Sequence, residues 1–116
     1  MSFGSPACDY VENSLDLTRF LISHPVPTYF MKMQADALKY AGIYNGDILV
    51  VDRSLPAADR RLIVAELNGE LTARRFRSHE GSTFLLGEDG RTPPYRLSRK
   101  DRFSVWGVVT SVIRKI

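Results

Sequence analysis

The chain has 116 residues, of which 44% are apolar and 25% charged, and a formal net charge of +3. This is typical of one soluble globular domain and is too short for two. Its one cysteine, Cys8, excludes an intrachain disulfide and the common cysteine-based zinc sites. Residues 1–6 show neither the basic region nor the apolar region of a signal peptide, and no apolar run approaches the roughly 20 residues that span a bilayer. We expect a cytoplasmic protein that uses no cofactor, no metal and no membrane.

The N-terminal part predicts an arm followed by a short helix. Residues 1–14 show no sustained periodicity and predict an extended arm, whereas residues 15–116 predict a single β-domain. Asp16 can cap a short helix in which three apolar residues share one face, namely Leu17, Phe20 and Leu21. The prolines that follow end this helix, and we interpret His24 as a cation near its C-terminal dipole.

The stretch from residue 29 to residue 52 predicts two strands around a small-residue turn. Polar and apolar residues alternate over 29–33, a polar turn follows at 34–38, and an Asn-Gly-Asp turn at 45–47 precedes an apolar strand at 48–51. Two strands joined in this way can hold one residue in a fixed place, and that residue would be Ala37.

A β-hairpin is predicted around Asn68-Gly69, which separates the strand-like segments 61–67 and 70–76. With a two-residue turn, Ile63 faces Arg74 and Ala65 faces Thr72. Arg74 would then share a sheet face with a mostly apolar set, Ile63, Ala65, Leu67 and Phe76. Since the opposite face is also largely apolar, both faces of the hairpin should be covered.

The C-terminal third predicts two more strands and a long loop. A turn leads into a strand at 83–86, a loop rich in glycine and proline is expected over 87–98, and a β-branched strand at 103–113 bends at Gly107. Trp106 is expected in the core or an interface. The total is a mainly β chain of about seven short strands with one short helix.

Several motifs occur in the order in which they occur in a known family. The chain resembles the LexA/UmuD family of self-cleaving regulators, which use a serine-lysine dyad. The motifs are Asp36, Gly42-Ile43, Gly46-Asp47, Asp52, Asn68-Gly69-Glu70-Leu71-Thr72 and Val105-Trp106-Gly107-Val108-Val109. The segment 3–12 looks like the one that follows the self-cleavage site of UmuD. The resemblance implies the β-clip fold of the LexA and UmuD C-terminal domain and a homodimer.

The same resemblance implies that the dyad is degenerate. Where the family has Gly-Asp-Ser-Met, this chain reads Ala35-Asp36-Ala37-Leu38, so Ala37 occupies the position of the nucleophile. The family's lysine corresponds to Arg74, whose guanidinium is always protonated and cannot act as a base. We therefore expect no active catalytic residue, and we interpret Arg74 as a side chain that reaches solvent or pairs with Glu66 or Asp36. Because other positions of the motif also differ, divergence explains Ala37 better than one designed replacement.

The leading hypothesis is a non-catalytic interaction module similar to UmuD′, the processed short form of UmuD. The chain begins where that form would begin and shows no helix-turn-helix of a LexA-type repressor. The resemblance implies a homodimer that serves a UmuC-type, Y-family polymerase in error-prone translesion synthesis during the SOS response to DNA damage. The RecA filament on single-stranded DNA is a further expected partner.

Two alternatives remain open. The first is an active autopeptidase or trans-peptidase of the same family. The second is a small basic β-domain that binds single-stranded nucleic acid through its tyrosines and through Arg74, Arg75 and Arg77. A solvated strand edge explains that arginine cluster as well, so we expect direct nucleic-acid binding to be weak or absent.

Overall fold

The computed structural model describes residues 7–8 and 16–116. The arm expected over residues 1–14 therefore lies almost entirely outside the described residues. Cys8 is exposed. In the part of the chain that the model describes, no helix is long and apolar enough to cross a membrane.

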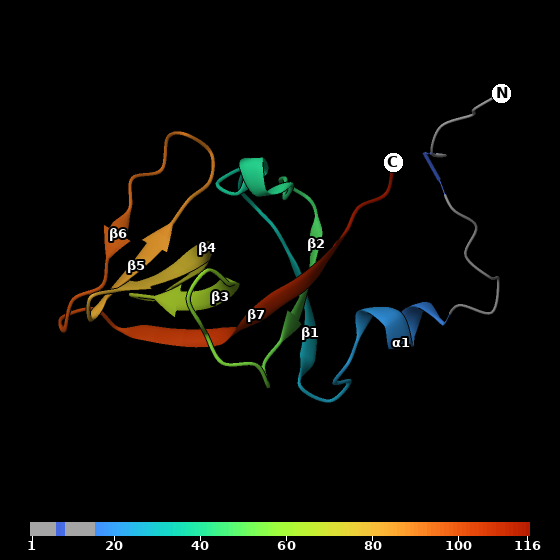
Figure 1. Cartoon of the computed structure of the whole chain (residues 1–116), viewed down its shortest axis with the longest axis horizontal. Helices are drawn as coiled ribbons and strands as arrows, with labels where there is room; N and C mark the ends of the chain where they lie inside the picture. The colour runs from blue at the N-terminus through green and yellow to red at the C-terminus, as the bar shows by residue number, and fades with distance from the viewer. Residues whose placement is uncertain (1–6, 9–15) are drawn as a thin grey trace, which may run out of the picture.

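The described chain forms one short helix, one 3₁₀ turn and seven strands (Figure 1). The elements are α1 (Leu17–Leu21), β1 (Thr28–Lys32), η1 (Lys39–Ala41), β2 (Ile48–Asp52), β3 (Leu62–Leu67), β4 (Glu70–His79), β5 (Ser82–Leu86), β6 (Tyr95–Arg96) and β7 (Phe103–Ile113). All strand pairs are antiparallel, in the order β1-β2-β7-β3-β4-β5-β6. The mainly β class is confirmed, and the arrangement is the expected β-clip fold.

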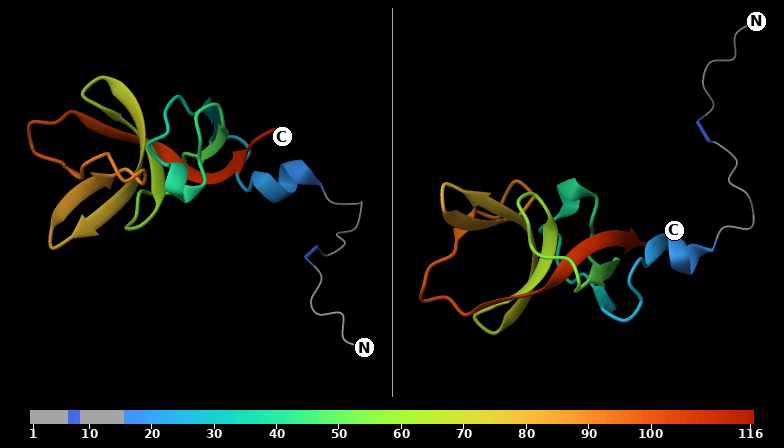
Figure 2. Two further views of the ribbon diagram at one scale, coloured as in Figure 1. Left: turned by 90° about the horizontal axis from the view of Figure 1, so that it is seen from above. Right: turned by 60° about the horizontal axis from the view of Figure 1, so that its bottom comes forward.

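Strand β7 connects the two halves of the molecule. Its C-terminal part pairs with β2 and its N-terminal part pairs with β3, and the register shifts once in each ladder. Figure 2 shows β7 running between the two groups of strands. Gly107 lies at the crossing, where a Cβ would come within 2.8 Å of the carbonyl oxygen of Asp52. A glycine is needed there because the backbones of β2 and β7 approach closely, which confirms the special role predicted for Gly107.

Two buried clusters lie on opposite faces of the β3–β4 hairpin. Val64 and Ala73 belong to a cluster with residues of β2 and of the segment after β1, Met33, Leu38, Ile43, Leu49 and Val51. Ile63 and Ala65 belong to the other cluster, together with Leu85 and Val108. Both faces of the hairpin are covered, as its pattern predicted.

The predicted hairpin register is confirmed, with Ile63 opposite Arg74 and Ala65 opposite Thr72. Asn68 and Gly69 have φ values of 51° and 89°, which is the positive-φ pair that a two-residue turn of this kind requires. The prediction of a loop over 87–98 was wrong in one respect, because Tyr95 and Arg96 form the short strand β6 beside β5. Two residues provide too short a pattern to be recognised in a sequence.

Candidate cleft and neighbouring polar clusters

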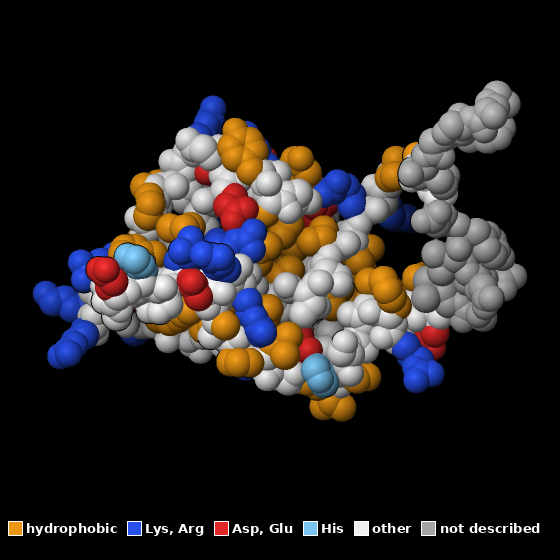
Figure 3. Space-filling model, in the orientation of Figure 1, with side chains coloured by type: hydrophobic (Ala, Val, Ile, Leu, Met, Phe, Trp, Pro, Cys, Tyr) orange, Lys and Arg blue, Asp and Glu red, His pale blue; other side chains and the backbone are white. Residues whose placement is uncertain are grey.

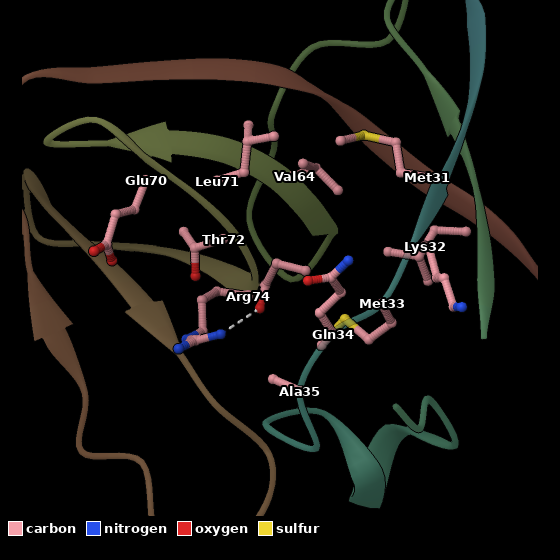
Figure 4. A pocket seen from close by; sticks show the side chains of 12 residues that line it. Met31, Lys32, Met33, Gln34, Ala35, Val64, Glu70, Leu71, Thr72 and Arg74 are labelled. Carbon is pink, nitrogen blue, oxygen red and sulfur yellow. Dashed lines mark hydrogen bonds between the residues drawn. The ribbon is translucent and has the colours of Figure 1, made fainter. Parts of the chain in front are cut away.

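A cavity of about 430 Å³ lies between the end of β1 and the first half of β4 (Figure 4). Its walls come from two segments and from two core residues between them: Met31, Lys32, Met33, Gln34, Ala35, Leu49, Val64, Glu70, Leu71, Thr72, Ala73 and Arg74. Strand β5 pairs only with residues 75–79 of β4, so residues 70–74 pair with β3 on one side and have no strand partner on the other among the described residues. The cavity, called the cleft below, therefore lies beside a free strand edge.

Ala37 follows the wall of the cleft and is itself buried, with 7% of its surface exposed. It lies two residues beyond the lining residue Ala35 and is not part of the lining itself. Its carbonyl oxygen accepts a hydrogen bond from the backbone of Glu88 at 2.7 Å, and Asp36 accepts one from the backbone of Asn45 at 3.0 Å. This segment is held in place from two sides, but its side chain at position 37 is a methyl group without a nucleophilic atom.

Arg74 is half-buried and lines the cleft on the β4 side. Burial lowers the pKa of its guanidinium, and the charge of Asp89 partly offsets this effect. Its Nη1 donates a hydrogen bond to the carbonyl oxygen of Ala73 at 2.8 Å (Figure 4). The expected ion pair with Glu66 or Asp36 was wrong: within the described residues Arg74 forms no ion pair. The backbone of the preceding residue therefore accepts a hydrogen bond from one of the five N–H groups of the guanidinium.

The arginines that follow Arg74 in β4 are bound by acidic side chains. Arg75 forms a two-pronged ion pair with Glu88, whose backbone also contacts Ala37. Arg77 donates to Asp59 at 2.9 Å. The basic cluster predicted from Arg74, Arg75 and Arg77 is therefore largely neutralised by carboxylates from other parts of the chain.

A second polar cluster, called the clasp below, joins His24, Asp52 and Ser54. Asp52 is buried with 3% exposure and accepts from Ser54 Oγ at 2.6 Å, and His24 Nδ1 lies 2.6 Å from its other carboxylate oxygen. Burial raises the pKa of Asp52, but hydrogen bonds from Ser54 and His24 outweigh this effect and lower it. The interpretation of His24 as a helix-end cation was wrong. Its ring contacts the carboxylate of Asp52, at the end of β2 and 28 residues further along the chain.

The clasp contains the residue types of a serine hydrolase without the required geometry. In a working triad the aspartate binds one ring nitrogen and the serine binds the other. Here Ser54 Oγ lies 3.2 Å from His24 Nδ1, the same nitrogen that contacts Asp52. Ser54 and His24 thus share one carboxylate, and the cluster ties the segment before β1 to the end of β2.

A second buried carboxylate, Asp47, is held by Arg114 near the end of the chain. Arg114 donates to both of its oxygens at 2.7 Å, and the backbone of Tyr44 donates at 2.8 Å. These bonds lower the pKa of Asp47 to about 2. The sequence analysis identified Asp47 as part of a turn and of a family motif but not its ion pair, because a partner 67 residues away leaves no local pattern.

Within residues 7–8 and 16–116, no group of three or more His, Cys, Asp or Glu side chains could hold a metal ion. The polar side chains that line the cleft carry the guanidinium of Arg74, the ammonium of Lys32, the carboxylate of Glu70, the amide of Gln34 and the hydroxyl of Thr72.

Comparison with known proteins identifies relatives over almost the whole chain. Residues 1–110 match the family described as peptidase S24-like. Protein ImpA of Salmonella typhimurium is 35% identical over 113 residues, which are 97% of this chain and 77% of that protein. Protein MucA of Escherichia coli is 33% identical over 109 residues, which are 93% of this chain and 74% of that protein.

A repressor is also among the relatives. The LexA repressor of Bordetella avium is 33% identical over 113 residues, which are 96% of this chain and 53% of the repressor. Together with the β-clip fold, these matches confirm the resemblance found in the sequence: the chain belongs to the peptidase S24-like family, the family of LexA and UmuD.

Proposed function

We propose that this protein is a non-catalytic accessory subunit of an error-prone, UmuC-type translesion DNA polymerase in the SOS response, and that it works as a homodimer. The observation that supports the proposal is the cleft, with its two walls and free strand edge, together with the residues in and beside it. By the resemblance, the buried Ala37 next to the cleft and Arg74 in its wall correspond to the nucleophile and the base of the family.

The proposed loss of catalysis follows from the chemistry of these two side chains. A serine-lysine pair needs a hydroxyl and a desolvated amine that can accept its proton. Ala37 has no oxygen. Arg74 is half-buried, but a guanidinium whose pKa starts above about 12 remains protonated near neutral pH even when burial lowers it. Neither half of the proton transfer is available.

Association is supported by exposed apolar side chains near the N-terminal end of the described domain. In α1 none of the five residues is buried, and Leu17 and Phe20 are 62% and 70% exposed. Three further exposed residues follow in and before the edge strand β1, namely Val26, Tyr29 and Phe30. We call these five side chains the α1–β1 surface. Large exposed apolar groups beside an edge strand are typical of an interface.

Figure 3 shows hydrophobic side chains near the part of the molecule where α1 and β1 lie in Figure 1. In the proposed dimer the α1–β1 surface of one copy covers that of the second. Two copies related by a two-fold axis place the same patch on both sides of the contact, so one substitution changes the interface twice.

The homodimer is tested by replacing Phe20 and Phe30 with glutamate and measuring the mass in solution by light scattering. We expect the wild type to be a dimer and the double variant a monomer, because two buried charges per chain would be placed in the contact. Tyr40→Glu is the matched control, since Tyr40 is 72% exposed and lies outside this surface. A dimer that survives the double variant would exclude this surface as the interface.

The accessory role is tested by co-purification with a UmuC-type polymerase from the same cell. We expect a stable complex with the wild type and with an Arg74→Ala variant, because the proposal makes the cleft dispensable for association. A polymerase that binds neither form, under conditions in which the dimer is intact, would contradict the role.

A trans-peptidase of the same family is the second candidate. It is favoured by one observation, the intact cleft with the free edge of residues 70–74. An extended peptide can add to such an edge by backbone hydrogen bonds. Cleavage assays separate the two candidates, because binding to the edge requires no nucleophile and cleavage does.

A further inference from the structure

Five cations occur in the short segment between residues 91 and 102. Arg91, Arg96, Arg99, Lys100 and Arg102 are all exposed, and none of them forms an ion pair with the described residues. Arg91 follows Gly90, which lies against Tyr40 of η1, so we call only the other four the basic tip. Lys and Arg side chains project in Figure 3 from the end of the molecule at which β6 and the start of β7 lie in Figure 1.

The only carboxylate in this segment is used to fold it. Asp101 accepts hydrogen bonds from Tyr95 Oη at 2.7 Å, from Asn68 Nδ2 at 2.9 Å and from the backbone of Ser98 at 2.9 Å. These bonds lower the pKa of Asp101 to about 2, so it stays ionised while its oxygens bind neutral groups of the loop. The neighbouring cations are left for an external anion. Of the neighbouring acids, Asp89 accepts hydrogen bonds from the backbone of Arg91 and Thr92, and Glu66 lines a hollow together with Arg102.

The composition of the tip favours a nucleic acid over a protein partner. Protein interfaces usually have an apolar centre surrounded by a polar rim. The only exposed large hydrophobic side chain among residues 91–102 is Tyr95, at 41% exposure. One aromatic ring together with four cations is instead the combination that binds single strands, since the cations follow phosphates and the ring stacks on a base.

We propose that the basic tip binds single-stranded nucleic acid. The flexible backbone of a single strand can follow a small convex loop and offer a base to Tyr95, which a paired duplex cannot do. The proposal differs from the arginine cluster considered for the sequence: Arg75 and Arg77 are paired with Glu88 and Asp59, whereas the cations of the tip are unpaired. It does not depend on the accessory role, since either can fail without the other.

The test is a titration of the full chain into a fluorescent oligo-dT of about 20 nucleotides, followed by anisotropy at several salt concentrations. We expect binding at about 50 mM salt that weakens as salt rises, because counterions are released from the phosphates. The variant Arg99→Gln/Lys100→Gln/Arg102→Gln should bind at least about tenfold more weakly. It should also lower the slope of log K against log salt by about 2, given roughly 0.7 per phosphate contact on a single strand.

The matched control is Arg19→Gln/Lys39→Gln/Lys115→Gln, which removes the same charge from outside the tip. The control should weaken binding less than the tip variant does. Its slope of log K against log salt should stay near the wild-type value. Both triple variants alter side chains that make no hydrogen bond among the described residues, so both should fold. Should the tip variant unfold, Lys100→Glu alone replaces it, because Lys100 is exposed in a turn.

Tyr95 provides a second, independent readout. Tyr95→Leu should weaken binding by about tenfold and leave the salt slope unchanged, because stacking involves no counterion. Tyr95→Phe retains the ring and should restore most of the affinity. The proposal is overturned if no binding occurs at low salt, if the control variant weakens binding as much as the tip variant, or if Tyr95→Leu binds like the wild type. The proposal is also overturned if poly-glutamate displaces the oligo-dT as well as unlabelled oligo-dT does, or if duplex DNA binds more tightly. Either result would show that the tip binds polyanions other than single strands.

Discussion

The cleft and the clasp each contain half of what a hydrolase needs. The cleft has a free strand edge beside a cavity, and in the proposed function Ala37 and Arg74 supply neither nucleophile nor base there. The clasp has a serine, a histidine and a buried aspartate within hydrogen-bond distance, but Ser54 and Asp52 meet the same ring nitrogen of His24. Nucleophilic catalysis needs both the right residue types and the right geometry, and in this interpretation each region has only one of the two.

The two regions also differ in what holds them together. In the clasp, the carboxylate of Asp52 has hydrogen-bond partners within the cluster. It accepts two hydrogen bonds from Ser54 and one from His24. The cleft leaves the guanidinium of Arg74 with a single hydrogen bond to its own strand. We therefore interpret the clasp as a structural element and the cleft as a surface that has lost its reaction.

The largest expected effect comes from returning the chemistry to the cleft. The double variant Ala37→Ser/Arg74→Lys should cleave a long-form relative in trans at a rate on the order of 10²-fold or more above the wild type, because a hydroxyl and a desolvated amine are then both present. Each single variant should stay at background, since each lacks one partner. Rates are measured by mass spectrometry of the products. Equal cleavage by the wild type and the double variant would contradict this prediction, because it would show that Ala37 and Arg74 do not limit catalysis in the cleft.

The next largest effect should come from the clasp, and it should be on stability. Asp52→Ala leaves His24 and Ser54 without their shared acceptor in a buried site, so we expect a loss of about 2 kcal/mol in the free energy of unfolding. Ser54→Ala removes one hydroxyl and should cost about 1 kcal/mol. Both values are read from denaturant titrations. Neither change should affect any cleavage by the double variant of the cleft; if Ser54→Ala abolished it, the clasp would be a site and not a support.

The smallest expected effect is a dependence of stability on acid pH. Hydrogen bonds from Arg114 and Tyr44 lower the pKa of Asp47 to about 2, and the pKa of Asp52 is also lowered. A carboxylate whose folded pKa is lowered stabilises the fold above its unfolded pKa near 4, and this contribution disappears as pH falls toward 2. Thermal unfolding should therefore show a falling midpoint from about pH 4 to pH 2.

The Arg114→Gln variant sharpens this prediction. Without Arg114 the pKa of Asp47 should return toward its ordinary value, so the variant should lose less stability than the wild type over the same range of pH. Lys115→Gln removes the same charge from the neighbouring residue and serves as the control. Parallel pH profiles for wild type and Arg114→Gln would show that Asp47 does not contribute to the acid dependence.

The parts of the fold that sequence reasoning predicted are those determined locally. The Asn68-Gly69 turn determines the pairing of β3 with β4, so the position of Arg74 opposite Ile63 followed from counting residues. The two strands around Ala37 followed from alternation and from the turn at 45–47. The strand β6 did not, because two residues carry no periodicity.

The polar contacts depend on long-range folding and could not be predicted. His24 and Asp52 are 28 residues apart, and Asp47 and Arg114 are 67 apart. No spacing rule joins such residues until the strands have paired. The contact of Arg74 was missed for a different reason, because the bond from its guanidinium to the carbonyl oxygen of Ala73 depends on the side-chain conformation, which the sequence does not reveal.

The central claim is that the molecule acts by association and not by cleavage. The most direct measurement incubates the purified wild-type chain with a long-form relative and RecA filaments on single-stranded DNA, and quantifies product by mass spectrometry. The relative carries a serine-to-alanine change so that it cannot cut itself. The account predicts no product above the blank without this chain. Cleavage that an Arg74→Ala variant abolishes would contradict it.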